Sequence, residues 1–321
     1  MSSRAGLIGL LQGRRVEHCL LATPAGGWAL VVPRLAARVL AAGLDERNAL
    51  WVSPSLERCL EGLDWNAGGQ RTWLAPELGP RGFFGAGESD WAVPPALDPG
   101  AFRLEEARSS SASCRGDCRI ASADGAEYRL EITRQVEISD LPGKPPGGAV
   151  LLRIRHSLRN TGRTAIAACA GLWSIVQLPC SPEGTLLLPD LPYRSYFGDL
   201  PAAWMSRQAG RLELRTAPGR RYKVGQRPPK PEARLAHRRR EAAGETLVLM
   251  RCPCSPEGLY LDGPLAEPGA KPGSGDALQA YNSPLSGREA FCELECHAPA
   301  SRLAPGESNG QAVDIEIRYG T

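Results

Sequence analysis

Carboxylates, an imidazole and small apolar groups alternate along residues 289–297. Odd positions hold Glu289, Phe291, Glu293, Glu295 and His297, and even positions hold Ala290, Cys292, Leu294 and Cys296. Successive side chains of a strand point to opposite faces, so the two central carboxylates and the imidazole share one face. Such a face can accept hydrogen bonds from sugar hydroxyls, and a desolvated carboxylate on it can accept a proton. A solvent-facing strand with ordinary surface charges is the alternative.

A second cluster of chemically useful residues spans positions 65–79. Trp65 and Trp73 could stack on sugar rings, while Arg71 and Glu77 could bind hydroxyls through charge-assisted hydrogen bonds. The adjacent pair Gly68 and Gly69 would let the backbone approach a ligand closely. A tight turn with both tryptophans in the core explains the same residues.

Period-two alternation predicts the strands that would position these residues. It is clear over residues 128–138, 150–158 and 313–319, where apolar and polar side chains alternate. Long amphipathic helices are hard to find. Residues 33–44 suit either a short helix or a buried strand. These patterns predict an all-β fold of antiparallel sheets with few short helices.

Turn residues punctuate the whole chain. Its 36 glycines and 28 prolines separate short apolar runs. Pro-Cys-Ser-Pro-Glu-Gly occurs at 179–184 and again at 253–258, which suits two type I turns and would fit two equivalent hairpins. Residues 141–148 and 267–275 resemble loops and not linkers, because strand-like pattern resumes on both sides. We therefore expect one domain over residues 1–321.

Charge and composition narrow the range of partners. A net charge of +3 does not favour nucleic-acid binding, although residues 220–240 carry nine cations and one acid, Glu232. We expect an exposed loop there, forming a solvated basic surface or an anion site. Apolar stretches of membrane-spanning length and a secretory signal are absent, so a cytoplasmic protein with reduced cysteines is expected.

Several other chemistries fit the sequence poorly. The pairs Cys114/Cys118 and Cys252/Cys254 have no second Cys or His pair at zinc-finger spacing, so no metal site is expected. Neither a phosphate-binding Gly-rich loop nor a nucleophile elbow is present. Nucleotide hydrolysis and serine-hydrolase chemistry are therefore not expected.

The motifs together resemble a known superfamily. Residues 68–79 resemble the Gly-Gly…Pro-x-x-Gly signature of the hexose-6-phosphate mutarotase branch of the aldose 1-epimerases. The C-terminal motifs of that family are similar in order and spacing to residues 276–281, 291–299 and 303–307. The turn at 159–162 resembles the family's asparagine-containing turn. The resemblance implies a β-supersandwich of the galactose mutarotase type, a sugar ligand in a shallow polar cleft and no cofactor.

The sequence departs from the family pattern at both catalytic positions. The family's acid histidine would fall near Trp173, where no histidine lies, and its glutamate matches Leu294, between Glu293 and Glu295. Either glutamate could be the base after a β-bulge. Candidates for the missing acid are His297, Lys223 and Tyr281. His156 shares its strand face with apolar residues and is expected to be buried and hydrogen-bonded.

Two functions from different classes stay open, and an interaction protein that uses residues 220–240 is a weaker third. The first is an isomerase that interconverts sugar anomers, with Glu293 or Glu295 as base, His297 as a candidate acid and Arg71 holding hydroxyls. The second is a sugar-binding module that has lost the acid. In both, the expected substrate contacts are Arg71, Trp73, Glu77, Trp173, Lys223 and Tyr281. A phosphorylated or acidic sugar is expected if the basic segment faces the cleft.

Overall fold

Two antiparallel sheets of ten strands each form the body of the protein. The computed structural model describes residues 3–141, 148–167, 170–228, 230–241, 244–264 and 274–320. The first sheet runs in the order β1 (Cys19–Ala22), β2 (Gly27–Val32), β3 (Arg38–Leu44), β5 (Gln70–Ala75), β10 (Gly171–Pro179), β19 (Phe291–His297), β18 (Leu278–Asn282), β15 (Tyr222–Gln226) and β12 (Arg194–Ser195), with β4 (Arg47–Asn48) paired to β3.

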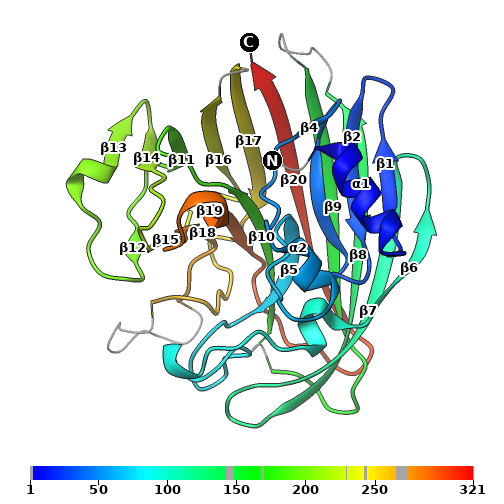
Figure 1. The fold of residues 1–321 in the computed structure, drawn as a ribbon. Helices are drawn as coiled ribbons and strands as arrows, with labels where there is room; N and C mark the ends of the chain where they lie inside the picture. Colours follow the sequence, from blue (N-terminus) through cyan, green and yellow to red (C-terminus); the bar gives the residue numbers. More distant parts are fainter. Residues whose placement is uncertain are drawn as a thin grey trace.

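The second sheet is built from longer strands. Its order is β13 (Met205–Gln208), β14 (Arg211–Arg215), β11 (Gly184–Pro189), β16 (Glu232–Glu241), β17 (Gly244–Pro253), β20 (Ser308–Gly320), β9 (Ala149–Asn160), β8 (Glu127–Asp140), β7 (Ser111–Ala121) and β6 (Phe102–Ala107). Figure 1 shows β20, in red, between β17 and β9. The predicted all-β class is confirmed, and so are the predicted strands within β8, β9 and β20.

The main hydrophobic core lies between the two sheets. It joins Leu294 and Cys296 of β19 to Ile154 of β9 and to Val313 and Ile315 of β20. Alternation along each strand explains this arrangement, because every second side chain points toward the other sheet. Burial of this apolar surface is the main stabilising contribution to the fold.

The core also encloses paired polar groups. The Thr72 hydroxyl lies 2.7 Å from Nδ1 of His156, and Arg134 donates to the amide oxygen of Gln70. Burial lowers the pKa of His156 well below its usual range, so the ring is neutral. The prediction that His156 is a buried, hydrogen-bonded histidine is confirmed.

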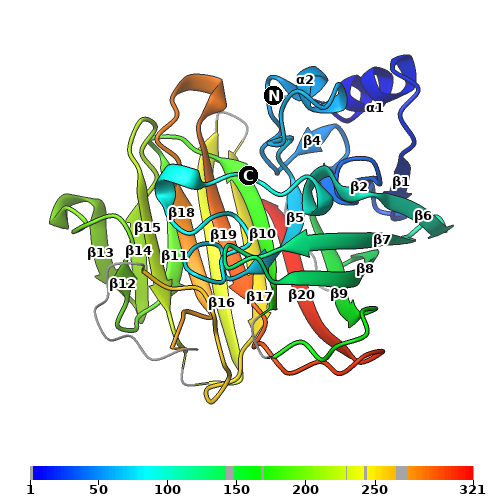
Figure 2. The ribbon, with the colours of Figure 1, turned by 90° about the horizontal axis from the view of Figure 1, so that it is seen from below.

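Two short helices pack at one end of the first sheet. Helix α1 (Arg4–Gly13) and helix α2 (Leu56–Leu60) lie near β1, β2 and β4 in Figure 2. Leu7 and Leu11 of α1 share an apolar cluster with Trp28 of β2 and Leu60 of α2. The remaining helical segments are single turns at Glu88–Asp90, Ala96–Gly100, Ala202–Trp204 and Gly287–Glu289.

Some expectations from the sequence need correction. Residues 38–44 are a fully buried strand, so the strand interpretation of 33–44 holds for that part. Both repeated turns form, with Gly184 donating to Ser181 O and Gly258 to Ser255 O. Neither turn closes a hairpin, because β10 and β11 belong to different sheets and residues 259–261 form no strand.

Several smaller expectations concern loops, thiols and membrane spans. Most of the predicted loops 141–148 and 267–275 lies outside the described residues. The nine cysteines within the described ranges are free, buried thiols, including the two pairs considered for zinc. In the described parts of the chain, no helix has the length and apolar character that crossing a membrane requires.

Candidate functional site

Strands β5, β10, β19, β18 and β15 present a polar face away from the core. Glu293 and Glu295 lie on this face of β19, whereas the intervening Leu294 points into the core. A cavity of about 570 Å³ opens over the face and is also lined by loops that follow β5 and β12. Its lining residues come from segments more than two hundred positions apart, such as Arg71 and Glu293.

Four tryptophans form an aromatic wall of this cavity. They are Trp65, Trp73, Trp91 and Trp173. Ring centroids lie 5.3 Å apart for Trp65 and Trp73, and 5.6 Å apart for Trp73 and Trp173. The Trp73 indole donates to the buried carboxylate of Asp98, which also pairs with Arg38 at 2.5 Å. This buried ion pair fixes the orientation of the Trp73 ring.

An arginine–glutamate pair lies beside the aromatic wall. Nη2 of Arg71 is 3.0 Å from Oε1 of Glu293, and the Gln177 amide donates to the same oxygen at 3.0 Å. The guanidinium stacks on Trp73, 4.0 Å from the ring centroid. Its Nε and Nη1 are buried without a hydrogen-bond partner. Arg71 therefore holds Glu293 in place while two of its buried donors stay unpaired within the described residues.

Lys223 is the centre of a buried charge cluster. Its Nζ lies 3.1 Å from Glu295, 3.6 Å from Glu77 and 4.0 Å from Asp262. Burial by itself would lower the pKa of Lys223, but these carboxylates raise it, so the ammonium stays charged. Burial raises the pKa of Glu295 to about 8. Lys223 and Arg71 are two cations beside four acids, and burial of two of these acids, Glu77 and Glu295, raises their pKa values.

Glu77 faces the cavity from the loop after β5. Its carboxylate accepts a hydrogen bond from Nε1 of Trp91 at 2.9 Å, and its backbone N–H donates to Asp262 at 3.1 Å. Burial raises the pKa of Glu77, as do the nearby charges of Asp262 and Glu293, whereas Lys223 and Trp91 oppose this shift. A carboxyl group in this setting can hold a proton at higher pH than a free glutamate.

The structure also places the other predicted site residues. Tyr281 lines the cavity, and burial raises its pKa to about 12. Glu295 and His297 lie behind the lining, with the imidazole stacked on Trp173 at 5.0 Å between centroids. Burial lowers the pKa of His297 to about 3, so the imidazole is neutral near pH 7. Trp173 donates to Glu295 at 2.9 Å.

Sequence reasoning missed several groups in the lining, among them Trp91 and Asp262. Both lie in irregular loops, where no periodicity marks which side chains point inward. The expectation that Gly68 and Gly69 approach a ligand is also corrected. A β-carbon on either glycine would meet the backbone of Trp51 or Val39 at 2.3 Å, so the pair serves a tight turn against neighbouring strands.

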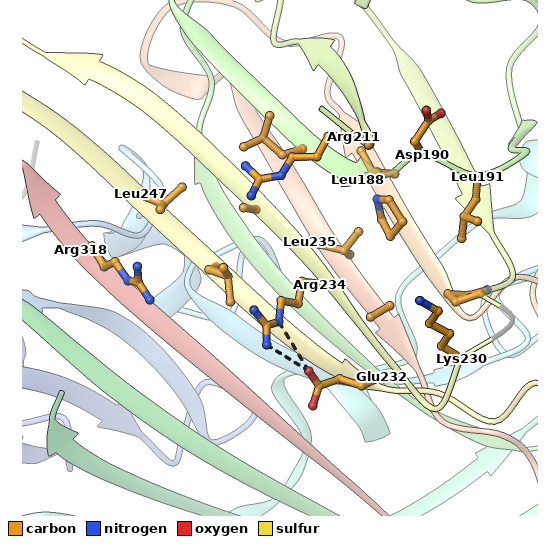
Figure 3. A pocket seen from close by; sticks show the side chains of 17 residues that line it. Leu188, Asp190, Leu191, Arg211, Lys230, Glu232, Arg234, Leu235, Leu247 and Arg318 are labelled. Carbon is orange, nitrogen blue, oxygen red and sulfur yellow. Dashed lines mark hydrogen bonds and ion pairs between the residues drawn. The ribbon is translucent and has the colours of Figure 1, made fainter. Parts of the chain in front are cut away.

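The basic segment 220–240 is not an exposed loop. Residues Tyr222–Gln226 form β15 and Glu232–Glu241 form β16. Of its described residues, only Arg221 and Lys223 line the aromatic cavity. Arg234 lies in a separate groove of about 600 Å³ on the second sheet, near Arg211 and Arg318 and paired with Glu232 (Figure 3). The segment therefore serves two different surfaces.

Comparison with solved structures identifies the class of fold. A putative aldose 1-epimerase from Escherichia coli K12 superposes with a TM-score of 0.54 at 13% identity, covering 95% of this chain and 100% of that one. A galactose mutarotase-like protein from Lactobacillus casei ATCC 334 superposes with a TM-score of 0.55 at 12% identity, covering 94% of this chain and 100% of that one. Galactose 1-epimerase from Lactobacillus acidophilus NCFM superposes with a TM-score of 0.53 at 13% identity, covering 94% of each chain. The fold is the galactose mutarotase-like β-sandwich.

A narrower assignment comes from the sequence family. Residues 17–312 match the model of a family of unknown function, DUF6786, and the chain belongs to this family. No curated protein matches the sequence.

Proposed function

We propose that the aromatic cavity binds a neutral sugar and that the protein interconverts the anomers of an aldose by acid–base chemistry. The convergence of Arg71, Glu77, Lys223 and Glu293 on one tryptophan-lined cavity carries the proposal. Aromatic faces stack on the C–H faces of a pyranose, and the charged groups bind its hydroxyls. The similarity to a putative aldose 1-epimerase and to a galactose 1-epimerase supports the same class of ligand.

The charges of the lining favour a neutral ligand over a phosphorylated or acidic one. Among the described lining residues, each of the three cations already has an acidic partner: Arg71 has Glu293, Arg221 has Glu88, and Lys223 has Asp262. A phosphate would add negative charge beside four lining acids. We therefore expect binding of unmodified aldoses.

Glu293 suits the role of base better than Glu295. Glu293 lines the cavity and is held by Arg71 and Gln177, whereas Glu295 is buried behind the lining. In the proposed reaction Glu293 removes the proton of the anomeric hydroxyl as the bond from C1 to the ring oxygen breaks. Rotation about C1–C2 and reclosure then give the other anomer.

A sugar-binding module without catalysis is the second candidate. Trp173 occupies the region where the resemblance implies an acid histidine, and its indole N–H is committed to Glu295. An indole does not act as a general acid near neutral pH. This candidate predicts sugar binding with no anomer exchange.

Calorimetry and NMR together test the proposal. Glucose and galactose are titrated into the protein, and exchange between their α and β anomers is followed by NMR. We expect saturable binding and exchange faster than in buffer, with binding weakened about tenfold or more by Arg71→Ala because hydrogen bonds to a charged donor are lost. Glu127→Gln, which removes a surface carboxylate paired with Arg119, is the matched control. Absence of binding would refute both candidates.

A further inference from the structure

Anomer interconversion requires a proton donor at the ring oxygen as well as a base. Proton transfer at one oxygen alone does not open the ring at a useful rate. The donor must contact the cavity, carry a proton near neutral pH and lie within reach of a sugar whose anomeric hydroxyl faces Glu293. Only groups in the lining can meet the first condition.

Most of the available groups fail one of these conditions. The rings of Trp173 and His297 stack on each other. The Trp173 indole N–H already donates to Glu295, and His297 lies behind the lining, out of contact with the cavity. Lys223 lies within 4.0 Å of three acids, which raise its pKa despite burial, and burial raises the pKa of Tyr281 to about 12. An acid whose pKa lies far above the working pH transfers its proton too slowly to be an effective general acid.

Glu77 contacts the cavity, and its surroundings favour a protonated carboxyl group by raising its pKa. It lines the same cavity as Glu293 and reaches it from the loop after β5, whereas Glu293 comes from β19. The charged and polar groups near it are Lys223 of β15, Asp262 and Trp91 of neighbouring loops, and Glu293 of β19. Two of these are acids, and Lys223 is shared with Glu295 and Asp262.

We infer that Glu77 is the proton donor of this site, so that the reaction uses two carboxyl groups in place of a carboxylate and a histidine. The inference rests on the proposed anomer interconversion. Glu77 gives its proton to the ring oxygen while Glu293 takes the proton of the anomeric hydroxyl, and the C1–O5 bond breaks to leave the open-chain aldehyde. Ring closure reverses both transfers, so each group returns to its starting state and no further reactant is needed.

Replacement of the carboxyl group tests this role. We expect Glu77→Gln to lower kcat for anomer exchange of glucose or galactose by roughly 10²- to 10⁴-fold, the range of general acid catalysis, with little change in KM. Glu77→Asp is expected to recover part of the rate. Glu127→Gln again serves as the control, because its carboxylate pairs with Arg119 on the surface.

The pH dependence provides a readout that a merely structural role would not affect. The rate of the wild-type protein should fall as pH rises through the raised pKa of Glu77. Because the Trp91 N–H stabilises the carboxylate of Glu77, Trp91→Phe should move the alkaline limb to higher pH. This measurement stands even if Glu77→Gln does not fold.

The possible outcomes separate this inference from the proposed function. Wild-type exchange with a rate that Glu77→Gln leaves within twofold would overturn the inference and keep the function. Binding without wild-type exchange would overturn the inference and leave a binding module. An unmoved alkaline limb in Trp91→Phe would also count against Glu77. Loss of the alkaline limb in Glu77→Gln, with binding retained, supports the inference.

Discussion

At the scale of single residues, the unusual feature is a surplus of buried acids around two cations. Arg71 and Lys223 share Glu77, Asp262, Glu293 and Glu295. Removing carboxylates from water is costly, and burial accordingly raises the pKa of Glu77 and of Glu295, which favours retention of their protons. Sequence alternation located Glu293 and Glu295 on one face of a strand, but it could not reveal how many cations would face them.

Glu295 provides a direct test of this proton retention. Its pKa rises from 4.5 to about 8 on folding, so the folded state binds the proton more tightly than the unfolded state. The resulting contribution to stability is fully present below pH 4.5 and is lost as pH rises toward 8. In Glu295→Gln this loss is absent. We expect the free energy of unfolding of the variant, minus that of wild type, to increase with pH by up to about 1.4 kcal/mol per unit.

Urea unfolding at a series of pH values between 4.5 and 8 measures this difference. Glu127→Gln is the control, because this exposed carboxylate has its pKa lowered by Arg119 and should show no such slope in this window. Parallel pH profiles for wild type and Glu295→Gln would show that folding does not raise the pKa of Glu295.

At the scale of elements, the strands could be predicted from the sequence, but the pairing of each strand with its neighbours in the sheet could not. The period of two in β8, β9, β19 and β20 gave both the element and its inward face. Pairing of β10 with both β5 and β19 brings Arg71 and Glu293 together, and this depends on long-range contacts that no local pattern encodes. The loops that carry Trp91 and Asp262 lacked any period, which is why these residues were missed.

The turn before β5 yields a prediction at this scale. Gly69 has φ of +74°, and an added β-carbon would lie 2.3 Å from Val39 O. Gly62 has φ of +76° with open space around it. An alanine there would therefore show the cost of the left-handed backbone conformation alone, without a steric clash. We expect Gly62→Ala to lower the free energy of unfolding by about 1–2 kcal/mol, and Gly69→Ala to lower it by a further 1–3 kcal/mol or so because the backbone must shift. Equal urea midpoints for the two variants would contradict this.

At the scale of the whole molecule, the two sheets share one core. The largest apolar cluster contains residues of β2 and β3 from the first sheet together with residues of β8, β9 and β20 from the second. We propose that the chain behaves as a single domain, because neither sheet can bury its inner face without the other. The sequence suggested this from the absence of a linker, whereas the shared core supplies the physical reason.

Cooperative unfolding would follow from such a shared core. Far-ultraviolet and near-ultraviolet circular dichroism should give the same urea midpoint, because secondary structure and side-chain packing are lost together. Met250→Ala, which opens a cavity in the shared core, should lower both midpoints equally. Two separated transitions would instead indicate independent folding units.

The concentration of indole rings at the cavity has a practical consequence. Four of the seven tryptophans line it, while the others, Trp28, Trp51 and Trp204, lie elsewhere in the fold. Indole emission depends on local polarity and on contact with neighbouring groups, so a molecule that displaces water from this wall should alter the intrinsic fluorescence of the protein. The chain thus carries its own optical reporter of occupancy, which allows unlabelled compounds to be screened before any reaction is known.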